Sequence, residues 1–90
     1  MKGVELENFR KAILTVADAN QSRFGLGAAA FKLHVANLGF SEVEAKEVQR
    51  EAEYLAEKGL LTEANKTLSP ENRLWKITAA GRDFLAADAA

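Results

Sequence analysis

Apolar residues in the first part of the chain recur at the spacing of amphipathic helices. Residues 5–20 contain one such stripe, which consists of Leu6, Phe9, Ile13, Val16 and Ala17. Leu14 lies off this stripe, so it needs a second surface to cover it. Residues 26–39 predict a second, shorter helix with Gly39 at its C-terminal end. The residues expected to face inward from it are Phe31, Val35 and Leu38.

The longest periodic segment spans residues 42–58 and predicts a third helix. Ser41 and Glu44 have the spacing of a capping box, in which the serine oxygen accepts a backbone N–H and the glutamate reaches back. The helix is therefore expected to begin at about Glu42. At about 100° per residue, its buried stripe comprises Ala45, Val48, Ala52 and Leu55. Gly59 supplies the left-handed conformation that ends the helix.

After Gly59 the pattern becomes that of strands. Residues 60–67 and 73–78 predict two strands, separated by a turn at residues 69–72 that contains the single proline. Leu26 is expected to add a very short strand to the edge of this ribbon. Together with the helices, the ribbon gives an α+β fold.

The last helix is predicted to begin directly after the second strand. Thr78 is expected to cap it, and the helix is expected to run to about Ala87. A two-stranded ribbon is not stable alone, so its inner face must be covered. The residues of that face are Leu61, Trp75 and Ile77. Gly81 would let the last helix approach closely, and Phe84 and Leu85 would close the bottom of the core.

Three segments in this order resemble the winged-helix branch of the helix-turn-helix proteins. They are "EAEYLAEKGLLTE" (51–63), "SPEN" (69–72) and "WKITAAGRDFL" (75–85). The first resembles the passage from the third helix into the wing, and the second stands where the wing tip belongs. The third is similar to the passage from strand to last helix in the MarR, PadR and ArsR groups. Small winged-helix proteins encoded by Mu-like phages and prophages show similar spacing.

The resemblance covers roughly residues 6–86, and it implies a single winged helix-turn-helix domain over residues 1–90. The implied order is helix, very short strand, helix, helix, strand, wing, strand and helix. None of the three segments is a catalytic motif.

Composition narrows the classes of function. The chain has 90 residues, no cysteine and a formal net charge of −1. Its apolar runs are far shorter than the roughly twenty residues that cross a bilayer, and no apolar signal core follows the first residues. We therefore expect a cytoplasmic protein without a membrane partner. Nucleic-acid-binding domains usually carry a basic excess, so the net charge opposes DNA binding unless the charges are segregated.

The resemblance implies a way of binding double-stranded DNA. Winged-helix proteins read bases with the third helix, and the wing adds phosphate or minor-groove contacts. In this sequence the corresponding helix residues are Ser41, Lys46, Gln49 and Arg50. The corresponding residues of the wing and its flanks are Lys66, Arg73, Lys76, Arg23 and Lys32. The expected function is that of a small transcriptional regulator of phage or prophage origin. It would act as a homodimer, with apolar surface at Val4, Leu14 and the alanine-rich last helix.

The charge of the third helix supports an alternative. Residues 42–58 contain six glutamates and three cations, and Val43, Glu53 and Glu57 share the outer face with the DNA candidates. Carboxylates repel phosphates, whereas an acidic helix attracts a basic protein surface. The alternative is a winged-helix protein-interaction module that uses Glu47, Glu53 and Glu57. Intrahelical ion pairs, Glu42 with Lys46 and Glu47 with Arg50, would explain the charges without any ligand.

Catalysis has little basis in this sequence. His34, the single histidine, lies near the edge of the second helix's buried stripe and has no second ligand at metal-binding spacing. Gly25, Gly27 and Ala30 fit the loose pattern GxGxxA, but polar residues precede them where a dinucleotide site needs a hydrophobic strand. These glycines are expected to shape the approach to the second helix. No serine has a neighbouring base. We expect no enzyme, no catalytic residue, no metal ligand and no cofactor.

Overall fold

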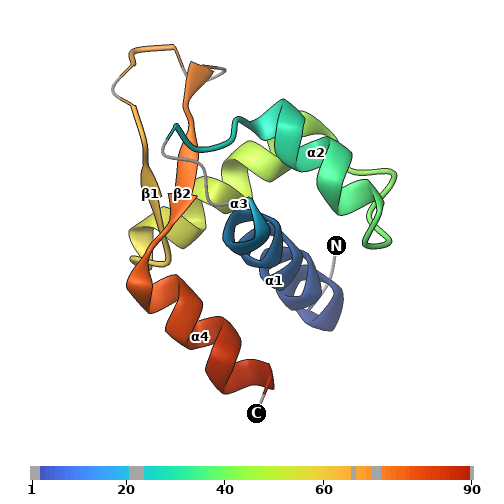
Figure 1. Ribbon diagram of the computed structural model, residues 1–90. Helices are drawn as coiled ribbons and strands as arrows, with labels where there is room; N and C mark the ends of the chain where they lie inside the picture. Colours follow the sequence, from blue (N-terminus) through green and yellow to red (C-terminus); the bar gives the residue numbers. More distant parts are fainter. Residues whose placement is uncertain (1–2, 21–23, 66, 70–71, 90) are drawn as a thin grey trace.

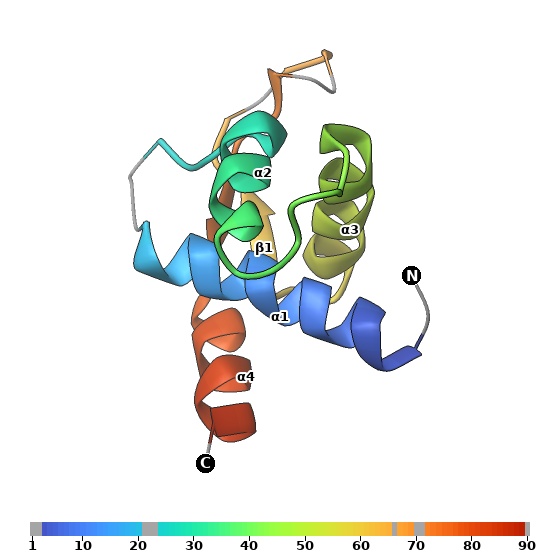
Figure 2. The same ribbon diagram turned by 90° about the vertical axis from the view of Figure 1, so that its right-hand side faces the viewer.

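The computed structural model describes residues 3–20, 24–65, 67–69 and 72–89. Its described part has an α+β fold with four helices and one two-stranded antiparallel sheet (Figure 1). The elements are α1 (Gly3–Ala19), α2 (Ala28–Ala36), α3 (Ala45–Glu57), β1 (Leu61–Glu63), β2 (Trp75–Ile77) and α4 (Ala79–Ala89). The second view shows α2 and α3 on one side of α1 and α4 on the other (Figure 2). Within the described residues, no helix has the length and apolar character to cross a bilayer.

The apolar stripe of α1 faces the core as predicted. Its buried members are Phe9, Ile13, Val16 and Ala17, and Leu6 is half-buried. Leu14 is fully buried as well, because residues of α3 and α4 cover this part of α1. Leu14 therefore offers no surface for a homodimer, and that part of the prediction is wrong. Val4 is exposed, as expected.

Helix α2 is shorter than predicted. Phe31 and Val35 are buried, but Leu38 is 48% exposed, so the prediction that it faces inward is wrong. The reason is that α2 ends at Ala36 and Leu38 lies in the following turn. Gly39 still ends the helix as predicted: it has a φ of 99°, its N–H donates to the Ala36 carbonyl at 3.3 Å, and the Phe40 N–H donates to the Val35 carbonyl at 3.1 Å.

The start of α3 also differs from the prediction. Glu44, not Ser41, is the N-cap, and its N–H donates to the carboxylate of Glu47 at 3.2 Å in a capping box. Glu44 has an extended backbone (φ −93°, ψ 155°), so the residues before it cannot belong to the helix. Val43 consequently packs into the core, 6% exposed, and the prediction that it lies on the outer face is wrong.

The inward face of α3 agrees with the sequence pattern. Val48, Ala52 and Leu55 are buried, and Ala45 is half-buried. Gly59 has a φ of 79° and follows the C-cap, which confirms its predicted role at the end of the helix.

The predicted ribbon forms, with shorter strands and one fewer of them. Leu61 pairs with Ile77, and Glu63 pairs with Trp75. Leu26 forms an isolated bridge instead of a third strand: it exchanges backbone hydrogen bonds of 2.9 and 2.8 Å with Trp75. Gly25, with a φ of 77°, makes this approach possible, because a Cβ there would lie 2.8 Å from the Trp75 carbonyl oxygen.

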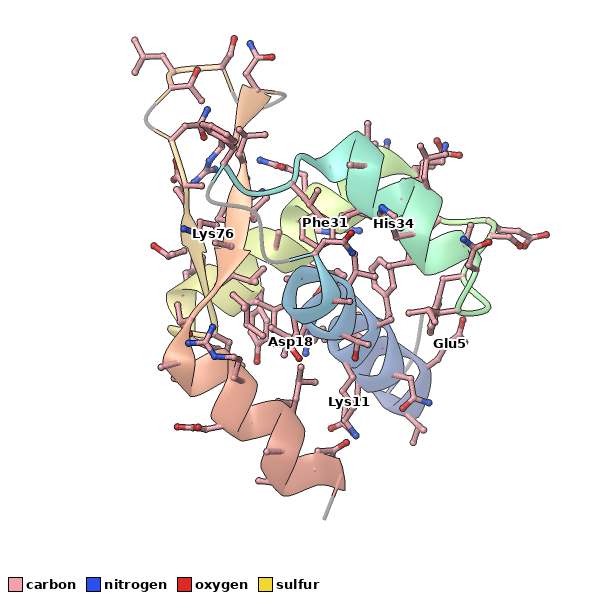
Figure 3. The ribbon with its side chains drawn as sticks, viewed as in Figure 1. Glu5, Lys11, Asp18, Phe31, His34 and Lys76 are labelled. Carbon is pink, nitrogen blue, oxygen red and sulfur yellow. The ribbon has the colours of Figure 1, made fainter. Side chains whose placement is uncertain are left out.

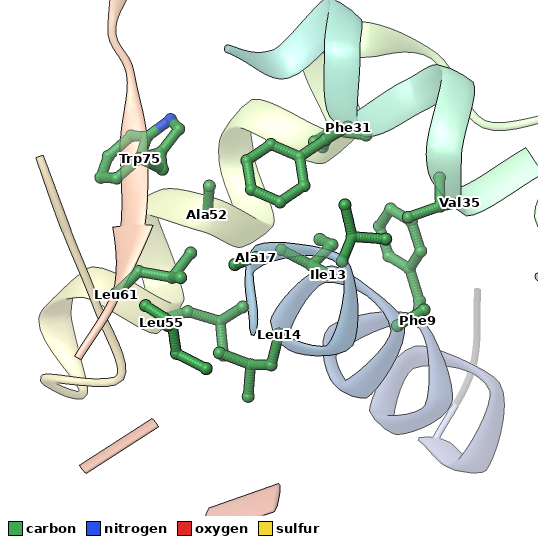
Figure 4. Close-up of a cluster of buried hydrophobic side chains, with 14 of the residues drawn as sticks. Phe9, Ile13, Leu14, Ala17, Phe31, Val35, Ala52, Leu55, Leu61 and Trp75 are labelled. Carbon is green, nitrogen blue, oxygen red and sulfur yellow. The ribbon is translucent and has the colours of Figure 1, made fainter. Parts of the chain in front are cut away.

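The ribbon contributes the largest buried side chain of the core. Its inward residues, Leu61, Trp75 and Ile77, are buried as predicted. They lie against apolar side chains from α1, α2 and α3 (Figure 4). At the predicted turn, the Asn72 N–H donates to the Ser69 carbonyl at 3.0 Å, while Pro70 lies outside the described residues.

The junction between β2 and α4 explains why a helix can follow the strand at once. The Thr78 Oγ1 accepts the Gly81 N–H at 3.0 Å, as expected of a cap, and donates to the Gly59 carbonyl at 2.6 Å. Gly81 is buried, and a Cβ there would lie 2.3 Å from the Leu60 carbonyl oxygen. The close approach predicted for Gly81 is confirmed.

Beyond Gly81, α4 leaves the core. Leu85 is half-buried, but Phe84 is 41% exposed, so the prediction that it closes the core is wrong. The helix extends past one side of α1 instead of lying across the core (Figure 2). Its far end is attached by Lys11, which reaches from α1 to within 3.0 Å of Asp88 (Figure 3).

Candidate nucleic-acid interface

The outermost face of α3 carries two cations in its N-terminal half. Lys46 and Arg50 lie one helical turn apart, and both are exposed. The intrahelical ion pairs expected for them, with Glu42 and with Glu47, are not formed among the described residues. Both cations are therefore available to a ligand approaching this face.

The acidic charge of α3 is compensated from outside the helix. Between Ala45 and Glu57, α3 has four glutamates and two cations. Arg10 of α1 pairs with Glu51 at 2.7 Å, and Arg73 of the hairpin pairs with Glu53 at 3.0 Å. Neighbouring elements thus offset part of the negative charge of α3, with Arg73 shared between Glu53 and Glu63. Sequence reasoning missed this compensation because each partner lies far away along the chain.

Arg73 is at the centre of a bonded group that joins the hairpin to α3. Its Nη1 donates to Glu53 Oε1, its Nη2 donates to Glu63 Oε1, and its guanidinium lies 4.7 Å from the centre of the Trp75 ring. The hydrogen bond to Glu63, with the negative charges of Glu63 and Glu53, raises the pKa of Arg73 above its ordinary value.

Gln49 closes this group from the helix side. The Trp75 Nε1–H donates to Gln49 Oε1 at 3.3 Å, and Gln49 Nε2 donates to Glu53 Oε1 at 3.4 Å. We call the set of Gln49, Glu53, Glu63, Arg73 and Trp75 the Arg73 clamp. Two residues predicted to contact DNA, Gln49 and Arg73, thus bind to other parts of the protein.

The opposite flank of α3 has a similar arrangement. The Arg10 guanidinium lies 3.8 Å from the centre of the Tyr54 ring while it pairs with Glu51. The Lys58 Nζ lies 5.6 Å from the centre of the same ring. An arginine stacked on an aromatic side chain therefore fastens α3 both to α1 and to the hairpin.

The remaining predicted DNA residues lie at different places. Ser41 is exposed in the turn before α3, and Lys32 is half-buried on α2. Lys76 is half-buried on β2, on the strand face opposite to the one that carries Trp75 and Ile77 (Figure 3). Lys66 and Arg23 lie outside the described residues.

The acidic residues of the alternative function also differ in their surroundings. Glu47 is half-buried and takes part in the capping box, and Glu53 belongs to the Arg73 clamp. Glu57 is exposed and pairs with no cation in the part of the chain that the structure describes.

A groove of about 520 Å³ lies between α1, α3 and α4. Its apolar and aromatic lining consists of Leu14, Tyr54, Leu55, Leu60 and Phe84. Its charged lining consists of Glu7, Arg10, Lys11, Lys58 and Asp88. Sequence reasoning did not anticipate the groove, because Phe84 was expected in the core. The ion pairs of Arg10 and Lys11 satisfy two of its three cations within the protein.

The other candidates for chemistry do not assemble into a site. His34 is exposed on α2, and the described residues contain no group of three metal-ligating side chains. Gly27 is the N-cap of α2 and Gly25 makes the close approach to Trp75, so both glycines shape the approach to this helix as expected.

Comparison of the chain with protein families, with curated proteins and with solved structures gives no significant match.

Proposed function

We propose that this protein binds double-stranded DNA as a small winged-helix domain, with the N-terminal half of α3 facing the groove and the hairpin lying along the backbone. The observation that carries the proposal is the presence of two exposed cations, Lys46 and Arg50, on the outermost face of α3, with no ion pair to any described residue. Arginine pairs bidentately with guanine, and lysine contacts either guanine or phosphate.

The arrangement of the elements supports the fold part of the proposal. The order of three helices, a hairpin and a last helix is that of winged-helix proteins, and the bridge at Leu26 stands where the short edge strand belongs. The resemblance to winged-helix regulators extends the proposal to the control of transcription in a phage or prophage. A homodimer remains a prediction; of the apolar surface expected for it, Val4 and several alanines of α4 are exposed.

The compensation of charge supports DNA binding over the acidic alternative. Arg10 pairs with Glu51, and Arg73 is shared between Glu53 and Glu63, so these cations offset part of the phosphate-repelling charge of α3. A protein-interaction surface made of Glu47, Glu53 and Glu57 would have to use two carboxylates that already bind other groups of the protein.

The direct test is a binding titration with pooled short duplexes at two salt concentrations. We expect the double variant Lys46→Gln/Arg50→Gln to bind at least about tenfold more weakly at low salt. The slope of log K against log salt should become shallower by about 0.9 for each phosphate that the variant no longer neutralises.

The control removes the same charge from α1 and from the C-terminal end of α3. Lys11→Gln/Lys58→Gln changes two cations beside the groove, and it should alter DNA binding much less than Lys46→Gln/Arg50→Gln does. Absence of any binding by the unmodified protein at low salt would refute the proposal. Equal losses in the two double variants would show that binding is only a response to total charge.

A further inference from the structure

We infer that the Arg73 clamp holds the hairpin in position on α3 for DNA binding, so that Glu53 and Glu63 are positioning residues that favour binding despite their negative charge. This inference rests on the proposed function and assigns a role within it. It reverses the expectation from charge alone, by which every carboxylate on α3 weakens DNA binding.

The clamp engages Arg73 from three directions. One terminal nitrogen binds Glu53 of α3, the other binds Glu63 of β1, and the guanidinium carbon lies 4.7 Å from the centre of the Trp75 ring of β2. A guanidinium is a rigid planar fork, so two carboxylates bound to its two ends are held at a defined separation. Arg73 therefore fixes the position of β1 relative to α3.

A second path connects the same elements. Trp75 donates its indole N–H to Gln49, and Gln49 donates to the Glu53 oxygen that also accepts from Arg73. Glu53 is thus oriented by two donors, one from its own helix and one from the hairpin. Trp75 is 1% exposed, so the path is anchored in the core.

The Arg73 clamp lies at the end of the short hairpin ladder, next to the hairpin tip. β1 and β2 have three residues each, and the backbone ladder extends to the Ala64 N–H, which donates to the Leu74 carbonyl at 2.7 Å. Beyond it, the Asn65 side chain accepts the Leu74 N–H at 2.8 Å and donates to the Asn72 carbonyl at 3.0 Å. Short two-stranded ribbons are marginally stable by themselves. Arg73 lies where this ladder ends and the hairpin tip begins. Within the hairpin, Asn65 holds the two arms together at this point, and the bonds of Arg73 to Glu53 and Glu63 attach this end of the ladder to α3.

Two glutamates on the same face of α3 make a matched comparison. Glu53 is in the clamp, whereas Glu57 lies one turn further along, exposed and without an ion pair among the described residues. Glu53→Gln and Glu57→Gln remove the same charge from the same face. If only charge mattered, both variants would bind DNA more tightly.

The inference predicts that Glu53→Gln and Glu57→Gln change the affinity for DNA in opposite directions. Glu57→Gln should strengthen DNA binding modestly, because it removes a charge that repels phosphate. Glu53→Gln should weaken binding by about threefold, the size expected when a partly exposed ion pair is broken. Glu53→Gln should also change the fluorescence of Trp75, the single tryptophan, and speed hydrogen exchange at the Ala64 amide, while Glu57→Gln should change neither.

The experiment measures DNA binding, tryptophan emission and amide exchange for the unmodified protein and both variants. Weaker binding and faster exchange in Glu53→Gln alone support the inference. Binding by Glu53→Gln as tight as that of Glu57→Gln overturns it and leaves the proposed function intact.

If the unmodified protein does not bind DNA, the proposed function fails. Amide exchange alone then tests whether the Arg73 clamp holds the hairpin in position. Equal exchange at Ala64 in both variants would then overturn the positioning role, and faster exchange in Glu53→Gln would support it. If Glu53→Gln does not fold, as judged by circular dichroism, Glu63→Gln breaks the other arm of the clamp and takes its place in the comparison.

Discussion

Each flank of α3 is attached to a neighbouring element by an arginine, a carboxylate and an aromatic side chain. The two flanks differ in whether the carboxylate or the aromatic side chain is the buried one. On the α1 flank the side chain of Glu51 is 11% exposed, and Tyr54 is 36% exposed. On the hairpin flank Trp75 is 1% exposed, whereas the side chain of Glu53 is 43% exposed. Both flanks place an arginine between the acid and the ring.

The difference indicates which part of each flank holds the fold together. Burial of apolar area stabilises strongly, so the hairpin flank depends on Trp75 and tolerates changes to its carboxylates. A carboxylate removed from water needs its partner, so the α1 flank depends on the Arg10–Glu51 pair. The carboxylates of the hairpin flank are therefore the ones that can serve a function without loss of the fold.

Removal of the buried ring should have the largest effect on stability. Trp75→Ala deletes the largest fully buried side chain and should lower the free energy of unfolding by about 3–5 kcal/mol. Urea denaturation followed by circular dichroism measures this. Trp75→Phe, which keeps a ring but not the donor to Gln49, should lose clearly less. Equal losses in both variants would mean that the hydrogen bond, not burial, dominates this flank.

Breaking the pair on the α1 flank should have the second largest effect. Arg10→Met keeps an aliphatic side chain but removes the guanidinium that lies over Tyr54, and it leaves the Glu51 carboxylate without its partner, at an expected loss of about 1–3 kcal/mol. The control is Arg10→Met/Glu51→Gln, which removes the stranded charge and should recover part of the loss. A single variant as stable as the unmodified protein would contradict the role given to this pair.

Truncation of the exposed ring should have the smallest effect. Tyr54→Ala removes a surface ring that lies under Arg10 and beside Lys58, and it should cost about 1 kcal/mol. Tyr54→Phe keeps the ring and should be nearly neutral in the same denaturation experiment. If Tyr54→Ala were as damaging as Trp75→Ala, the contrast between the two flanks would not hold.

Sequence reasoning succeeded where a structure depends on local spacing. The apolar stripe of α1, the glycine at the end of α3 and the Thr78 cap could all be predicted, because helical periodicity and capping involve residues a few positions apart. It placed the start of α3 at Glu42 because the serine pattern is locally plausible. Burial of Val43 in the core outweighed that pattern.

The candidate site could be predicted only in part. The sequence identified Lys46 and Arg50 as exposed cations, since their place on α3 follows from its period. It could not reveal that Gln49 binds Trp75 or that Arg73 binds Glu53. Arg73 and Glu53 are 20 residues apart in sequence. No periodic pattern records such a pairing.

By itself, the sequence determined the order of the helices and strands and most of the buried core, because both follow from the alternation of apolar and polar residues. Only the tertiary structure decided which charged side chains of α3 form ion pairs within the protein and which are available to a ligand. Arg10 and Glu51 are 41 residues apart, and they meet because the packing of α1 on α3 brings them together. Ion pairs depend on where separate elements come to lie in space, and the pattern along one element carries no information about that.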